Sequence, residues 1–272
     1  MPAINTNVAA LFAQQSLKVN ERNQSSAMRQ LSTGSRINTA SEDAAGMAIG
    51  QNMTSQVKGL NQAVRNVNDG INMMQTAEGA LGETSNMLQR MRELAVQSAN
   101  GTYSSDQRTY LQTEFVALSS QIGKIANDTK WNDQNLLLTA ATSFTYQAGK
   151  DANQTVSVTI GAMTLAGLNI TALITVSTAT TASSSLATLD SAIGLVNAQR
   201  ATIGAAINQM TYSADNLSNV AANAAASRSS IMDTDYATAS TQLSKTQIIQ
   251  QAATAMLAQA NQQPQAVLSL LK

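Results

Sequence analysis

The sequence predicts a mainly α-helical chain whose long coiled-coil helices form a rod, with a small β-hairpin region in the middle of the chain. Apolar residues recur at heptad spacing over long stretches in both halves. The prolines are Pro2 and Pro264, so residues 3–263 lack the strongest helix breaker. Only 3% of the residues are aromatic and 12% are charged, against about 25% charged in an average globular chain. Thin helical seams are therefore favoured over a thick globular core.

The first half contains two expected helices. Steps of three and four between apolar residues predict a helix over residues 44–99, which Asn100 and Gly101 end. A second helix is expected after Ser104, whose hydroxyl can form a capping box with Gln107, and it should end near Asp128. The apolar seam of the first helix consists of Val57, Leu60, Val64, Val67, Ile71, Met74, Leu81 and Leu88.

The middle of the chain has a different pattern. Residues 144–148 and 156–160 alternate with period two around a turn at residues 149–153, which predicts a β-hairpin within about residues 140–170. Residues 171–185 are rich in serine and threonine with small apolar residues, and are expected to form a surface connection.

The second half repeats the heptad pattern of the first. Arg200 is the charged member of an otherwise uncharged seam, and two interpretations stay open: it fixes the register by requiring a polar partner, or its long stem reaches solvent. The seam comprises Leu186, Leu189, Ile193, Val196, Arg200, Ile203, Ile207, Met210, Ala214, Leu217, Ala221 and Ala224.

Both ends of the chain are polar helices with thin apolar stripes. Residues 4–33 and 234–263 have no partner within their own segment, and such helices are marginal alone because most helical stability comes from packing. The two ends are therefore expected to pair with each other, in a subunit that completes its folding on assembly. The side chains expected to pack this terminal coiled coil are Val8, Leu11, Phe12, Leu31, Ile249, Ala252 and Met256.

The composition excludes several functions. The chain has no histidine and no cysteine, which removes imidazole general bases, thiol nucleophiles and His- or Cys-ligated metals, so we expect no enzyme activity, cofactor or metal. Sixteen basic and sixteen acidic residues form no basic stripe, so neither nucleic acid nor a membrane is an expected partner. The first twenty residues resemble no cleavable signal, so we expect secretion without cleavage.

Several long blocks resemble the bacterial flagellin family. They are INTNVAALFAQQSL near the start, LSTGSRINTASEDAAGMAIG, LQRMRELAVQSANGTYSSDQR, WNDQNLL, and the last block, which begins at DYATASTQ. The resemblance implies a terminal coiled coil of residues 1–43 and 233–272 lining a filament channel, and a helical rod domain of residues 44–232. Some family members carry a zinc protease in a central insertion, which the absence of histidine excludes here.

The resemblance also implies the function. The expected protein is a structural subunit that polymerises into the flagellar filament for swimming, outside the cell, after unfolded export by the flagellar type III apparatus. Its expected partners are other copies, an export chaperone on residues 235–272, the filament cap and hook-junction proteins. The alternatives are a hook-filament junction protein, which shares the terminal helices, and a secreted receptor ligand or adhesin.

Two sets of residues match positions that animal receptors read in this family. Gln89, Arg90, Leu94 and Glu114 match the positions that engage the flagellin-sensing Toll-like receptor, although the same residues serve filament packing. Arg90 and Leu94 are four residues apart, so we expect both to be exposed on the free subunit. Val267, Leu268, Leu270 and Leu271 resemble the leucine-rich tail read by cytosolic inflammasome receptors, with packing in the channel lining as the alternative.

Overall fold

The computed structural model describes residues 6–138, 142–170 and 174–269. The chain divides into two compact units. One contains residues 58–221, and the other contains residues 1–57 together with residues 222–272. Helices α2 (Ala44–Ala99) and α4 (Ala179–Met232) are shared between the units, because each helix has one part in the first unit and one part in the second.

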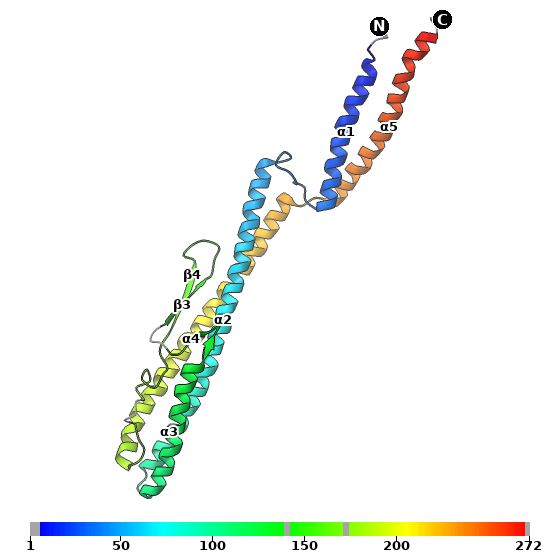
Figure 1. Cartoon of the computed structure of the whole chain (residues 1–272). Coiled ribbons are helices and arrows are strands. Elements are labelled where there is room, and N and C mark those ends of the chain that lie inside the picture. Colours follow the sequence, from blue (N-terminus) through cyan, green and yellow to red (C-terminus); the bar gives the residue numbers. More distant parts are fainter. Residues whose placement is uncertain (1–5, 139–141, 171–173, 270–272) are drawn as a thin grey trace. The chain divides into compact units, whose positions relative to one another are not determined.

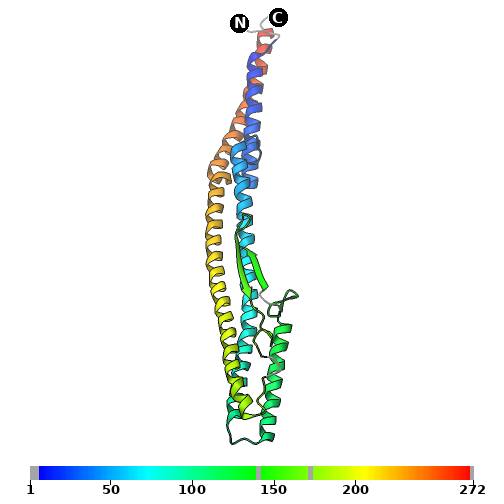
Figure 2. The same cartoon turned by 90° about the vertical axis from the view of Figure 1, so that its left-hand side faces the viewer.

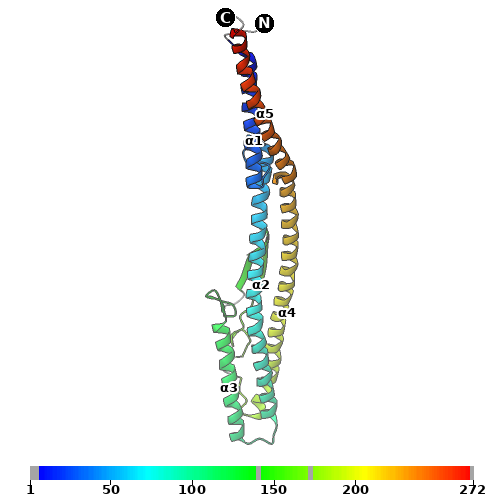
Figure 3. The same ribbon diagram turned by 90° about the vertical axis from the view of Figure 1, so that its right-hand side faces the viewer.

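The unit of residues 58–221 is a helical bundle. Its parts of α2 and α4 run alongside helix α3 (Ser105–Asp128), and α2 lies between α3 and α4 (Figures 2 and 3). The predicted capping box is confirmed, since Ser104 and Gln107 bond each other's backbone N–H groups. Every predicted seam residue of α2 and α4 is buried or half-buried. Large fully buried side chains contributed by the helices include Met74, Leu81, Leu88, Met91 and Leu94 of α2, Phe115 and Ile122 of α3, and Leu189, Ile203 and Met210 of α4.

The predicted hairpin is present on this bundle. Strands β3 (Thr142–Gln147) and β4 (Thr155–Ile160) pair antiparallel, and β4 alternates exposed and buried residues with Val156, Val158 and Ile160 facing the core. Strands β1 (Lys130–Trp131) and β2 (Gln134–Asn135) form a second small pair. Tyr146 packs over Gly70 of α2, where a Cβ atom would lie 2.9 Å from its ring. Glycine at position 70 therefore allows the hairpin to approach α2 closely.

The predicted surface connection at residues 171–185 is wrong from Ala179 onward. Helix α4 begins there, and Ala182 and Ser185 are buried. Thr178 and Thr181 bond each other's backbone N–H groups through their hydroxyls, which caps the first turn of the helix. Serine, threonine and alanine suggested a loop by composition. In the structure, the small side chains of Ala182 and Ser185 allow the helix to pack closely. Residues 171–173 lie outside the described residues.

The other unit contains the paired ends of the chain. Helices α1 (Val8–Thr33) and α5 (Tyr236–Ser269) lie side by side, with the N- and C-termini at the same end of the pair (Figure 1). Helix α1 ends at Gly34, which adopts the left-handed conformation with φ 71°. No helix within the described residues has the length and apolar character needed to cross a membrane.

Candidate assembly surface of the terminal helices

The contact between α1 and α5 is a narrow seam of alanine, leucine and polar side chains. Its positions follow steps of three and four without interruption on both helices, as in a coiled coil. Asn20, Ala27, Thr246 and Ala239 are its buried centre. The seam comprises Ala10, Ala13, Leu17, Asn20, Gln24, Ala27 and Leu31 of α1, and Ala239, Leu243, Thr246, Gln250, Ala253, Leu257 and Ala260 of α5.

Hydrogen bonds across the seam define its antiparallel alignment. Asn7 Nδ2 donates to the Ala260 carbonyl at 2.7 Å, and Asn20 Nδ2 donates to the Thr246 carbonyl at 2.7 Å. At the far end, the Tyr236 hydroxyl donates to the Leu31 carbonyl at 3.1 Å. The first turn of α1 therefore lies level with the part of α5 around Ala260.

The large apolar residues predicted to pack this seam are mostly outside it. Leu31 does lie on the seam, but Val8, Leu11, Phe12, Ile249, Ala252 and Met256 are exposed, so that part of the prediction is wrong. Phe12 is 71% exposed and Met256 is 67% exposed. Alanine at the contact lets the two helices approach closely, which leaves the larger side chains outside the pair. The pair thus has apolar surface that it does not cover itself.

One side of the pair gathers much of this surface. Phe12, Val19, Ile249, Ala252 and Met256 each stand one position before a seam residue. In an antiparallel pair, positions that precede the seam on the two helices share one side, because each residue turns the helix by the same angle. We call these five residues the assembly stripe. Residues 1–17 and 246–271 contain no charged side chain, so four of the five stripe residues lie in uncharged segments, and Val19 follows Lys18.

The connection between α1 and α2 pairs antiparallel with the connection between α4 and α5, through a bridge between Ser35 and Asp233. Arg36 N–H donates to the Met232 carbonyl at 2.6 Å, and Thr234 N–H donates to the Gly34 carbonyl at 3.0 Å. Arg36 Nη2 also donates to the Ile231 carbonyl at 2.7 Å, which satisfies the end of α4. These bonds tie both chain connections to each other at the base of the terminal pair.

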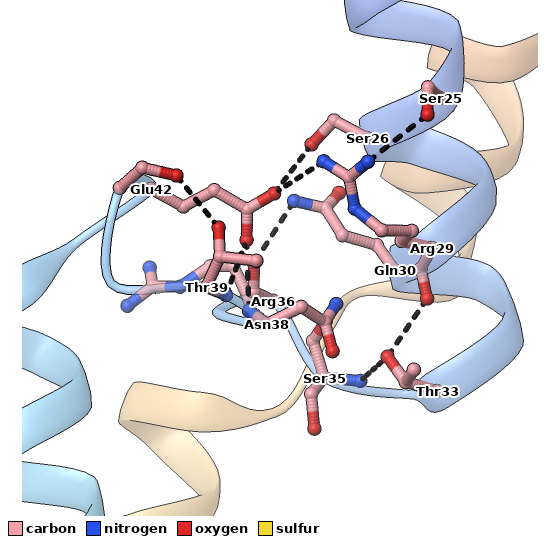
Figure 4. Close-up of polar contacts among 11 residues, drawn as sticks. Ser25, Ser26, Arg29, Gln30, Thr33, Ser35, Arg36, Asn38, Thr39 and Glu42 are labelled. Carbon is pink, nitrogen blue, oxygen red and sulfur yellow. Dashed lines mark hydrogen bonds and ion pairs between the residues drawn. The ribbon is translucent and has the colours of Figure 1, made fainter.

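Glu42 fastens the first connection to α1 (Figure 4). Its carboxylate accepts hydrogen bonds from the backbone N–H groups of Asn38 at 2.9 Å and Thr39 at 3.3 Å. It also accepts from the Ser26 hydroxyl at 3.1 Å and forms an ion pair with Arg29 at 3.2 Å. The hydrogen bond from Asn38 is the main cause that holds the pKa of Glu42 below its ordinary value of 4.5.

Changing Glu42→Gln is expected to destabilise this unit by about 1 kcal/mol at neutral pH. Because the pKa of Glu42 is lowered by folding, its stabilisation is present at neutral pH and is lost as the pH falls through the folded-state pKa, below 4.5. Denaturant unfolding should thus show a gap between wild type and variant at pH 7 that narrows as the pH is lowered below 4.5. Glu21→Gln is the matched control, since the Glu21 side chain has no hydrogen bond or ion pair with any of the described residues. A gap that stays constant as the pH is lowered until the native state unfolds would contradict the assignment.

Comparisons with known proteins match nearly the whole chain. The model of the bacterial flagellin N-terminal helical region matches residues 4–142, and that of the C-terminal helical region matches residues 186–271. The chain belongs to the bacterial flagellin family. It is 39% identical to the flagellar filament 33 kDa core protein of Treponema phagedenis and 40% identical to a flagellin of Halalkalibacterium halodurans, with 99% of each chain covered in both comparisons.

Solved structures share the fold. A crystal structure of Bacillus cereus flagellin has a TM-score of 0.51 at 33% identity, and the match covers 56% of this chain and 88% of that chain. A structure from Vibrio parahaemolyticus described as a flagellar hook-associated protein has a TM-score of 0.61 at 14% identity, covering 71% of this chain and all of that chain. At this low identity the second match shows the fold alone.

The residues predicted for receptor contact in this flagellin-family chain divide into two groups. Gln89, Arg90 and Glu114 are exposed, and Arg90 Nε lies 2.9 Å from Glu114 Oε1, which joins α2 to α3. Leu94 is 0% exposed and belongs to the core, so the expectation that Arg90 and Leu94 are exposed together is wrong. Four residues turn the helix by slightly more than one full turn, so Arg90 lies at the exposed edge of the seam and Leu94 lies inside it.

The predicted tail residues are only partly described. Val267 and Leu268 lie in the last described turn of α5, where only the backbone is described, and Leu270 and Leu271 lie outside the described residues. The alanine-rich seam of the terminal pair went unpredicted, although its seven-residue repeat from Ala10 to Leu31 is visible in the sequence. The prediction instead chose the exposed face, because the neighbouring positions there have larger apolar side chains, such as Leu11 and Phe12.

Proposed function

We propose that this chain is a structural subunit that polymerises into the bacterial flagellar filament. The observation that carries the proposal is the terminal pair, which buries small side chains between its helices and exposes Phe12, Ile249 and Met256. Burial of exposed apolar side chains on association is favourable by roughly 25 cal/mol per Å². An uncharged surface costs less to desolvate than a charged one, so the ends are suited to contacts between copies. Family membership and the filament proteins among the relatives support the same role.

The proposal assigns a place to each part of the chain. Residues 1–43 and 233–272 form the terminal coiled coil that lines the filament channel, and residues 44–232 form the outer domain. A contact in which one face of a copy binds a different face of the next generates an open helical polymer rather than a closed ring. The protein is thus placed outside the cell, in the flagellum, where it turns motor rotation into thrust.

Seeded growth tests the proposal. Heat-dissociated protein mixed with filament fragments is expected to grow long filaments, measured by sedimentation and electron microscopy. A junction protein, the main alternative, would stop after a short layer, and a secreted ligand or adhesin would not elongate. Continued growth from seeds supports the filament subunit, and absence of elongation at any protein concentration would contradict it.

A single substitution on the assembly stripe is expected to weaken growth strongly. Phe12→Gln removes a 71% exposed aromatic ring from the proposed contact and should raise the critical concentration for elongation by about tenfold or more. Gln14→Ala is the control, since Gln14 is an exposed polar residue of α1 that follows the seam residue Ala13 and so lies on the other side of the pair. Equal critical concentrations for the two variants would show that copies do not meet at Phe12.

The finer parts of the proposal rest on the family resemblance. The chain is exported unfolded through the flagellar type III apparatus, and a chaperone binds residues 235–272 before export. The filament cap and hook-junction proteins contact it in the assembled flagellum. The absence of cysteine suits such a passage, because no disulfide can lock the chain.

Recognition of the unassembled subunit by the animal Toll-like receptor is proposed through Gln89, Arg90 and Glu114. Arg90→Ala removes the guanidinium that joins α2 to α3 and should raise the protein concentration for half-maximal receptor activation about tenfold. Arg92→Ala is the matched control, because Arg92 pairs with Asp190 of α4 instead. Activation by the Arg90→Ala subunit at wild-type concentrations would contradict this role.

A further inference from the structure

Asn7 uses both ends of its side-chain amide. Its Oδ1 atom accepts a hydrogen bond from the Ala10 backbone N–H at 3.1 Å, which caps the start of α1. Its Nδ2 atom donates to the Ala260 carbonyl of α5 at 2.7 Å. One side chain thus satisfies the beginning of one helix and a backbone group of the other.

The acceptor of this bond has a special position. Helix α5 continues through Pro264, and proline has no backbone N–H to donate to the carbonyl four residues earlier, which is that of Ala260. Ala260 is half-buried in the seam, where a carbonyl without a donor is costly. The Asn7 amide therefore supplies the donor that the proline removes.

We infer that Asn7 is a positioning residue that sets the register of α1 against α5 by binding the carbonyl that Pro264 leaves open. The rest of the seam has a seven-residue repeat on both helices, so a slide of one heptad would again bring seam positions face to face. After such a slide Asn7 would face Ala253, whose carbonyl has an ordinary helical donor, and the carbonyl of Ala260 would lose its partner.

Asn20 shows why the proline matters. Its amide also donates to an α5 carbonyl, that of Thr246, but Gln250 four residues later retains its N–H. Equivalent carbonyls occur along the helix, so Asn20 stabilises the pair in any register. The bond at Asn7 holds Phe12 level with the stretch of α5 that contains Ile249, Ala252 and Met256, and so keeps the assembly stripe continuous across both helices.

Coupled substitutions test the inference in the unassembled full-length chain. Asn7→Ser keeps a capping oxygen but removes the amide donor, and should raise the unfolding equilibrium constant of the terminal pair about fivefold. In a Pro264→Ala chain, where Ala260 regains a helical donor, the same change should cost less than twofold. Asn20→Ser is the control and should cost the same with or without Pro264. An Asn7→Ser cost that is independent of Pro264 would overturn the inference.

Disulfide trapping reads the register directly, because the chain has no cysteine of its own. Ala13→Cys with Ala253→Cys reports the observed register, and Ala13→Cys with Thr246→Cys reports the slide of one heptad that brings Asn7 to Ala253. The first pair should cross-link faster, and Asn7→Ser should lower the ratio of the two rates about fivefold. Equal rates before the change, or an unaltered ratio after it, would overturn the inference. Neither measurement requires assembly, so a failure to elongate would count against the proposed function alone.

Discussion

Removal of residues 243–272 is expected to abolish elongation on filament seeds while the helical bundle stays folded. The truncation deletes most of α5, so Ala13 and Leu17 of α1 lose their partners and Asn20 loses its acceptor. A lone helix with a seam this thin is marginal in water, and the assembly stripe loses its half on α5. The bundle of residues 58–221 has its own core, centred on buried side chains such as Leu88 and Phe115, and does not depend on the deleted segment.

Sedimentation measures the elongation, and far-ultraviolet circular dichroism with thermal unfolding measures the bundle. The control is the truncated chain with a separate peptide of residues 236–272, which should restore part of the growth because it supplies α5 again. Filament growth by the truncated chain alone would contradict the pairing of the two ends as a requirement for assembly.

Reversal of the charge at Glu78 is expected to destabilise the bundle by about 2 kcal/mol. Arg200 Nη2 of α4 lies 3.2 Å from Glu78 Oε1 of α2, and the pair is the charged interruption of a mostly apolar seam. Glu78→Arg would place two like charges at this point, whereas Glu78→Arg with Arg200→Glu restores an opposite pair and should recover at least half of the loss. Denaturant unfolding of the four chains in this cycle provides the coupling free energy.

Arg92 and Asp190 provide the matched control. They also join α2 to α4, at 2.6 Å, but both side chains are about half exposed and lie outside the seam. Asp190→Arg should cost less than about 0.5 kcal/mol, because exposed ion pairs contribute little. If Glu78→Arg costs no more than Asp190→Arg, the seam pair does not fix the alignment of α2 and α4. Of the two interpretations of Arg200, the observed bond to Glu78 shows the polar partner, while the half-exposed guanidinium also reaches solvent.

The bundle was largely predictable because its seams consist of large side chains. Leu81 and Leu88 of α2, and Leu189 and Val196 of α4, recur at steps of three, four or seven and have no competing apolar face, so their burial followed from periodicity. The cap at Ser104 was predictable for a similar reason, since serine followed by glutamine three residues later has a direct local geometry. The beginning of α4 was missed because threonine, serine and alanine suit both loops and close helix contacts.

The candidate site was harder to predict because two faces of α1 compete. Val8, Leu11 and Phe12 have the larger side chains, but Ala10, Asn20 and Ala27 have the longer unbroken heptad pattern, and the structure buries the latter. Hydrophobicity favours burial of the first face. Close approach of the two helices, and the hydrogen bonds from the Asn7 and Asn20 amides to carbonyls of α5, favour burial of the second. Leu94 was also predicted on the wrong face. Its position four residues after Arg90 does not determine whether its side chain is exposed or buried in the seam.

The sequence by itself determined the helical class, the heptad seams, the hairpin, the flagellin-family membership and the absence of histidine and cysteine chemistry. These properties depend on residue order and local geometry. Only the tertiary structure decided that the terminal pair exposes Phe12 and Met256, that Glu42 fastens the connection to α1, and that Asn7 binds the carbonyl freed by Pro264. The bond between Arg29 and Glu42 joins residues 13 positions apart, and the bond between Asn7 and Ala260 joins residues 253 positions apart. The exposure of Phe12 and Met256 depends on which face each helix turns toward the other. The periodicity of one helix gives no information about its partner, so none of these features could be predicted from it.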